Sequence, residues 1–126
     1  MTNEATRLRG VRGATTVDAN TREAVLQATT ELLTTLIEAN DIRRDDVASV
    51  IFTTTADVNA EFPAVAARDM GWSNVALMCG HEMAVPGSLP MCLRILMHVN
   101  TAKTPDELRF VYLRGARVLR PDVAEA

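Results

Sequence analysis

The sequence predicts an α+β (mixed α/β) fold, a single mixed β-sheet with helices on one face. Three observations predict this class: one long segment with a helical repeat of apolar residues, several segments rich in β-branched residues, and the order of these segments. Helical segments come early and consecutive strand-like segments come late, which is typical of a mixed sheet covered on one side. The 126 residues suffice for one core but not for two, so we expect a single domain over residues 1–126.

The N-terminal third predicts the first strand and the first helix. Residues 7–17 mix glycines with β-branched residues, which predicts a strand that another segment approaches closely. Asn20 and Glu23 then form a capping-box-like start for an amphipathic helix that ends near Asn40. The apolar residues of this helix recur every three or four positions and predict its buried stripe: Val25, Ala28, Leu32, Leu33, Leu36, Ile37 and Ala39.

The rest of the chain adds one short helix and four strands. Pro63 and Gly71 suit the first turn and the end of a helix over residues 62–70. Strands are expected at 47–55, 74–79, 91–100 and 108–113. The third of these alternates, so one face is expected to carry Leu93, Ile95, Met97 and Val99, and the other Cys92, Arg94, Leu96 and His98.

Composition excludes several functional classes. The net charge of −3, from 13 basic and 16 acidic residues, lacks the basic field that nucleic-acid binding needs. The N-terminus has no apolar signal segment, and no stretch has the apolar length of a membrane span. Two cysteines are too few for a disulfide scaffold. We therefore expect a soluble cytoplasmic protein with reduced thiols, whose end segments 1–6 and 121–126 are flexible.

Arginines stand in unusual positions on this sheet. Its second face is expected to be partly bare, and a small domain with a bare apolar face usually self-associates. Arg94 lies in an otherwise apolar strand, so it faces solvent, points inward at a sheet edge to block further pairing, or binds an anion in a pocket. Arg12, between two glycines, either faces solvent or binds an anion. Arg68 and Arg120, taken alone, suit ordinary surface charges.

A second candidate cluster contains Cys79, His81 and Glu82. A Cys–His pair can act as a nucleophile and base, but no family signature surrounds this cysteine. Together with Cys92 and His98 the cluster offers two Cys and two His for zinc, although the spacing fits no finger or knuckle pattern. Glu82 alone is either a solvated loop carboxylate or an acceptor for a substrate hydroxyl.

Five segments resemble, in order, the monofunctional bacterial chorismate mutases of the AroH class. Each motif is weak alone, but the five follow one another without large gaps over roughly residues 8–122, which makes the set specific. They are RGVRGATTV (9–17), FPAVAAR (62–68), CGHEM (79–83), PGSLPMCLRILMHVNT (86–101) and VYLRGARVLRPD (111–122).

The resemblance implies a homotrimer whose subunit sheets pack into a pseudo-α/β barrel, with active sites between the subunits. It implies the conversion of chorismate to prephenate, a Claisen rearrangement on the route to Phe and Tyr. It implies no metal, no cofactor and no covalent intermediate. A partly bare sheet face agrees with such an assembly.

The resemblance also assigns roles by position. Arg94 would meet the ether oxygen and a carboxylate of the substrate, Glu82 would accept from the ring hydroxyl, and Arg12 would clamp a carboxylate. The remaining substrate-binding positions fall on Tyr112, Cys79, Phe62, Ala64, Arg68, Leu77, Met78, Leu119 and Arg120. The chain departs from the family at Val65, where some members carry a charge, and at Leu77–Met78, which is bulkier and more apolar than the Val–Thr pair of other members.

Two other functions fit such a chain. One is a trimeric imine or enamine deaminase of similar subunit architecture, which also holds a carboxylate with an interfacial arginine but has no need of Glu82 and Tyr112. The other is a non-catalytic protein that binds an aromatic-pathway metabolite, which would bind tightly without turnover.

Overall fold

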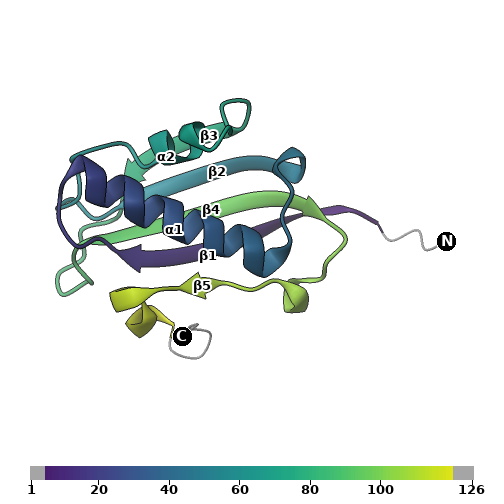
Figure 1. The fold of residues 1–126 in the computed structure, drawn as a ribbon. Helices are drawn as coiled ribbons and strands as arrows, with labels where there is room; N and C mark the ends of the chain where they lie inside the picture. The colour runs from purple at the N-terminus through teal and green to yellow at the C-terminus, as the bar shows by residue number, and fades with distance from the viewer. Residues whose placement is uncertain (1–4, 121–126) are drawn as a thin grey trace.

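The computed structural model describes residues 5–120, which form one five-stranded sheet with two α-helices on one face (Figure 1). The strands lie in the order β3-β2-β4-β1-β5. Strand β4 pairs antiparallel with β1 and β2, while the edge strands β3 and β5 run parallel to β2 and β1. The expected mixed sheet with one-sided helices is confirmed.

The central strands β1 (Arg7–Thr16) and β4 (Cys92–Thr101) pair over all their residues. The alternation predicted for β4 is present, since Leu93, Ile95, Met97 and Val99 are all buried in the main core. Gly13 of β1 provides the predicted close approach. A Cβ at this position would lie 2.8 Å from the Val111 carbonyl oxygen and 3.0 Å from the Leu32 side chain. A larger residue would therefore push the helix and the last strand away from β1.

Helix α1 (Arg22–Asn40) packs across the sheet with the predicted apolar stripe (Figure 1). Thr21 caps it by accepting a hydrogen bond from the Ala24 amide, so the prediction of Asn20 as the cap is wrong by one residue. The Asn20 side chain instead accepts from the amides of Asn59 and Ala60, a contact between distant segments. The stripe is confirmed: Val25, Ala28, Leu32, Leu33 and Leu36 are buried, and Ile37 and Ala39 are partly buried against them.

On the other side of β4 the sheet is completed by strand β2 (Val47–Thr54) and the edge strand β3 (Ala76–His81). Helix α2 (Ala64–Asp69) lies between these two strands in sequence. Pro63 is the N-cap of α2 rather than part of its first turn. Gly71 follows the helix with a φ of 91°, which glycine adopts without strain. Strand β3 extends beyond the predicted residue 79 because Gly80 and His81 pair with Thr53 and Thr54 of β2.

Strand β5 (Val111–Tyr112) is shorter than the predicted 108–113. Its two residues pair with Gly13 and Ala14, and a 3-10 helix, η3 (Arg114–Leu119), begins soon after. Residues 108–110 are apolar enough to suggest a strand, but no ladder continues there. On the sheet face away from α1, a small second cluster consists of Ala14, Cys92, Tyr112 and Ala116.

The sheet face opposite α1 is called the open face below. It carries Arg12, Ala14, Ser49, Ile51, Thr53, Met78, Gly80, Arg94, Leu96 and His98. Met78 is 66% exposed and Leu96 is also exposed, so in the described chain this face is partly bare, as expected.

Within residues 5–120 no helix is both long and apolar enough to cross a membrane. The expectation that the end segments 1–6 and 121–126 are flexible falls, except for Ala5 and Thr6, outside the described residues.

Candidate active site

A row of residues crosses the open face near its middle. Backbone pairing places Gly80 of β3, Thr53 of β2, Arg94 of β4 and Ala14 of β1 side by side, followed by Tyr112 of β5. The neighbours of Arg94 on either side, Thr53 and Ala14, are both short. The guanidinium of Arg94 therefore has room to reach a ligand.

Glu82 enters this row from the loop after β3. Its amide donates to the Thr54 carbonyl at 2.8 Å, which extends the parallel pairing of β3 by one residue. One carboxylate oxygen, Oε2, accepts a hydrogen bond from the Thr53 hydroxyl and lies 3.8 Å from Nε of Arg94. The side chains of Arg94 and Glu82 remain 40% and 30% exposed, so a ligand can reach both.

Arg94 has an unsatisfied hydrogen-bond donor. Its Nε is buried and has no hydrogen-bond partner among residues 5–120, since Glu82 lies beyond hydrogen-bond distance. A buried donor left in this state costs about 1–3 kcal/mol, and such groups call for a functional explanation. Burial raises the pKa of the neighbouring Cys92 thiol, and the Arg94 charge opposes that rise only in part. A side-chain contact between the thiol and Arg94 opposes the rise as well. Cys92 is thus a neutral neighbour that does not offset the charge of Arg94.

Arg12 lies on the same face, diagonal to Arg94. It stands opposite Leu96 in β4, two residues from Arg94, which corresponds to a backbone separation of about 7–8 Å. Its guanidinium lies 5.1 Å from the centre of the Phe110 ring, a contact that orients the cation without neutralising it. The open face therefore carries two arginines, of which only Arg94 is paired with the Glu82 carboxylate, and this excess of positive charge suits an anionic ligand.

The C-terminal end of the described chain borders the same row. Tyr112 is buried against Ala14 and Ala116, and Leu119 packs on this cluster. Arg120, half-buried, follows directly. These three predicted positions, Tyr112, Leu119 and Arg120, lie at the β5 side of the open face.

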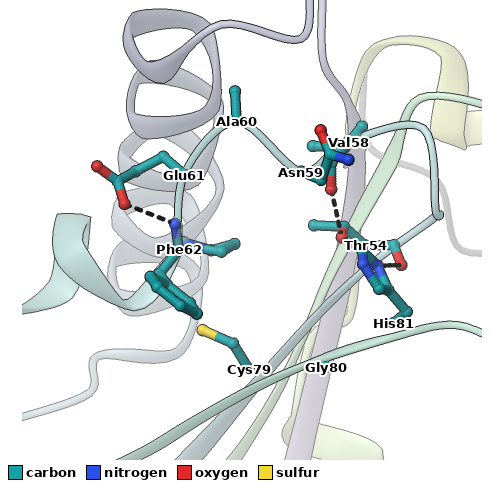
Figure 2. Close-up of a pocket in the computed structure, with 10 residues that line it drawn as sticks. Thr54, Val58, Asn59, Ala60, Glu61, Phe62, Cys79, Gly80 and His81 are labelled. Atoms are coloured by element: carbon teal, nitrogen blue, oxygen red, sulfur yellow. Dashed lines mark hydrogen bonds between the residues drawn. The ribbon is translucent and has the colours of Figure 1, made fainter.

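A hollow of about 320 Å³ lies at the other edge of the sheet, between β3 and the segment before α2 (Figure 2). In Figure 2 the Phe62 ring and the Cys79 thiol both project into this space. Phe62 is 65% exposed, so its ring presents apolar surface beside the hollow. The described residues that line the hollow include no Lys or Arg: they are Thr54, Val58, Asn59, Ala60, Glu61, Phe62, Pro63, Cys79, Gly80 and His81. By itself this hollow offers a dicarboxylate no lysine or arginine.

Cys79 is half-buried beside α2. Burial raises the pKa of its thiol, and the Ala64 amide and the Arg68 charge offset this only partly. A raised pKa is the reverse of what a nucleophilic cysteine needs. His81 is engaged elsewhere, since its Nδ1 lies 3.1 Å from the Thr54 hydroxyl. The geometry therefore does not support a Cys–His nucleophile.

The zinc interpretation is not supported either. In the described part of the chain, no three His, Cys, Asp or Glu side chains gather closely enough to hold a metal ion. His98 instead hydrogen-bonds through Nδ1 to the Ser49 hydroxyl at 3.0 Å.

The positions selected from the sequence fall into two groups that one chain does not bring together. Those on or beside the open face are Arg12, Met78, Glu82, Arg94, Tyr112, Leu119 and Arg120. Those on the helix side, around α2 and β3, are Phe62, Ala64, Arg68, Leu77 and Cys79, with Val65 half-buried on α2. The first group holds Arg12, Arg94 and Arg120, and the second lies around the hollow, which its one arginine, Arg68, does not line.

Sequence reasoning missed Thr53, which contacts Glu82 and pairs with Arg94. The run Thr53–Thr54–Thr55 carries no signal of function, because threonine is common in strands. Only the pairing register shows that Thr53, and not Thr54, shares a face with Arg94.

Over nearly its whole length the chain is similar to known chorismate mutases. A family model described as chorismate mutase type I matches residues 8–123. The chorismate mutase AroH of Thermus thermophilus is 49% identical over 120 residues, covering 94% of this chain and 98% of that protein. The AroH of Bacillus subtilis (strain 168) is 44% identical over 118 residues, 93% of each. A solved chorismate mutase structure from Clostridium thermocellum superimposes with a TM-score of 0.86 at 50% identity, covering 87% of this chain and 98% of that one.

Proposed function

The chain belongs to the chorismate mutase type I family, and we propose that it rearranges chorismate to prephenate at a site completed by a second copy of the chain. The observation that carries the proposal is the arrangement of Arg94 and Glu82. A cation with an unsatisfied hydrogen-bond donor lies beside a carboxylate on an accessible face of the sheet. The reaction is intramolecular. The ether C–O bond breaks while a C–C bond forms, so neither a nucleophile nor a redox group is required.

Arg94 is the residue to which we assign the rate acceleration. As the C–O bond breaks, negative charge builds on the ether oxygen. A fixed guanidinium then interacts more strongly with the transition state than with the ground state, and only such a difference raises the rate of the chemical step. The partly buried position of Arg94 strengthens this interaction relative to water.

Arg12, Glu82 and Tyr112 are assigned to substrate orientation. Chorismate carries two carboxylates, and the forked guanidinium of Arg12 suits one of them. The Oε1 oxygen of Glu82 is available to the ring hydroxyl because the Thr53 contact uses Oε2. Holding the ends of a flexible substrate selects the reactive conformer, which lowers the entropic part of the barrier.

A homotrimer with sites between subunits would bring the two residue groups together. The open face supplies cations without an enclosing wall, whereas the hollow beside Phe62 and Cys79 supplies a wall without cations. We propose that the helix-side group of one chain, including Ala64, Arg68 and Leu77, faces the open-face group of its neighbour. The exposed Phe62 and Met78 support this arrangement, because their apolar surface would be covered.

Two features of the proposed rim differ from those of other family members. Val65 supplies no charge, and Leu77–Met78 adds apolar bulk, so we expect weaker substrate affinity without loss of the central contacts. Leu119 and Arg120 would close the site from the β5 side. We propose the reducing cytoplasm as the compartment, which suits the free thiols of Cys79 and Cys92.

The experiment is to follow the loss of ultraviolet absorbance of chorismate with the purified chain and with Arg94→Ala, while sedimentation gives the oligomeric state. The proposal expects prephenate from the wild type, almost none from the variant, and trimers in both. An intact trimer that leaves chorismate unchanged would refute the mutase assignment. Release of ammonia from an imine substrate would then identify a deaminase, and tight binding of a metabolite without turnover a sensor.

A further inference from the structure

We propose that Thr53 is a positioning residue, which holds the Glu82 carboxylate out of hydrogen-bond reach of Arg94 and so leaves both charged groups available to substrate. The inference rests on the proposed function, because it concerns the two side chains assigned to the mutase reaction. It adds a residue to which the family resemblance gave no role.

The register places Thr53 between the two groups. On β2 it pairs with Gly80 of β3 on one side and with Arg94 of β4 on the other. Its hydroxyl therefore stands on the open face between the strand that leads to Glu82 and the strand that carries Arg94. The hydroxyl donates to Oε2 of Glu82.

The same carboxylate oxygen forms the long ion pair with Arg94. Oε2 lies 3.8 Å from Nε, whereas a hydrogen bond between charged groups has a length of about 2.7–2.9 Å. Nε is buried and without a partner in the described chain, so Arg94 would gain from a shift of roughly 1 Å that closed this gap. The Thr53 hydroxyl competes for Oε2 and opposes that shift.

A direct Glu82–Arg94 hydrogen bond would weaken both assigned roles. It would draw the carboxylate toward β4, away from the substrate hydroxyl, and the carboxylate would offset the guanidinium charge before the ether oxygen develops its own charge. A threonine hydroxyl avoids this because it is a neutral donor, which leaves the charge of the carboxylate intact. Its β-branched side chain is also stiff about χ1, so the donor has a fixed direction.

The test compares Thr53→Val, Thr53→Ser, Glu82→Gln and the double variant Thr53→Val/Glu82→Gln. Valine keeps the shape of threonine without the hydroxyl, and serine keeps the hydroxyl. Ser49→Ala is the matched control, since it removes a hydroxyl from the same strand and face, one that bonds to His98 rather than to Glu82. For each variant kcat, KM and the melting temperature are measured.

We expect Thr53→Val to lower kcat/KM about tenfold, mainly through kcat, while its melting temperature stays at or above that of the wild type. Stability is retained because Glu82 can then satisfy Nε of Arg94. Thr53→Ser should stay within about threefold of the wild type, and Ser49→Ala within about twofold. In the Glu82→Gln background, Thr53→Val should add less than about a further twofold, because its effect passes through Glu82.

Three results would overturn the inference: full activity of Thr53→Val, a melting temperature that falls in proportion to its activity, or additive effects in the double variant. If the wild type is active and Glu82→Gln is impaired while Thr53→Val is unaffected, the positioning role fails and the mutase proposal stands. If the wild type does not convert chorismate, both fail together.

Discussion

The two faces of the sheet are built from the same strands and differ in almost every other respect. Toward α1, strand β4 presents Leu93, Ile95 and Met97, all fully buried. Toward the open face the intervening positions include Arg94, with a buried donor that has no partner in residues 5–120. The period of two along one strand thus separates the residues that hold the fold from those assigned to chemistry. A substitution on one face should leave the property of the other face nearly unchanged.

Arg94→Lys is expected to have the largest effect, and it tests whether the open face can lose activity without loss of stability. Lysine keeps the positive charge but not the planar fork, so the proposed contact to the ether oxygen should be lost. We expect kcat to fall about 10²- to 10³-fold, with little change in melting temperature. Steady-state kinetics and thermal unfolding are measured on the same preparation. Parallel loss of activity and stability would show that Arg94 serves the fold.

The neighbouring residue provides the opposite case. Ile95 is 1% exposed on the covered face, and Ile95→Ala should destabilise the chain by about 2–5 kcal/mol through the cavity it leaves. Activity per folded molecule should be close to that of the wild type. Denaturant unfolding gives the first quantity and assay below the unfolding transition gives the second. A large drop in kcat of the folded variant would contradict the separation of the faces.

Arg12→Ala tests whether the second arginine of the open face contributes less to activity than Arg94. Arg12 is exposed and stacked on Phe110, so its removal should not destabilise the core. Loss of a charged hydrogen bond to a substrate carboxylate should reduce kcat/KM about 10- to 100-fold, with KM affected more than for Arg94→Lys. Unchanged kinetics would remove Arg12 from the site.

The cysteines give the smallest effect. Burial raises the pKa of both the Cys79 and the Cys92 thiol, so both should alkylate slowly at neutral pH and faster as the pH rises. Cys79, which lines the hollow, should react before the buried Cys92, and prephenate should protect it. Mass spectrometry after timed iodoacetamide treatment measures both rates. Protection of Cys92 alone would contradict the placement of the site.

The parts of this fold that follow from local pattern are the parts that sequence predicts. The stripe of α1 and the alternation in β4 lie within single segments, and both are present in the structure. The prediction of Asn20 as the cap of α1 is wrong because its side chain accepts hydrogen bonds from Asn59 and Ala60, which lie far away in sequence. The predicted length of strand β5 is too great, because apolar residues suggest a strand whether or not β1 continues to pair with them.

The candidate site shows the same limit more strongly. The sequence indicates Arg94 because it is a charge in an apolar strand, and the resemblance to a family indicates Glu82. Neither observation reveals that Thr53 lies between them, because that depends on the register of β2 against β3 and β4. The separation of the Phe62 group from the Arg94 group likewise required the fold.

The central claim is that the cations of one chain act with the hollow of another, and subunit mixing tests it most directly. Arg94→Ala removes the cation, and Phe62→Asp places a carboxylate at an exposed position where it would repel the dicarboxylate substrate. Co-expression with two affinity tags and purification through both isolates oligomers that contain both variants. If sites form between neighbouring chains of a cyclic trimer, each mixed trimer keeps one intact site, so about one third of the wild-type activity is expected. Doubly tagged trimers as inactive as either variant alone would contradict the claim and confine the site to one chain.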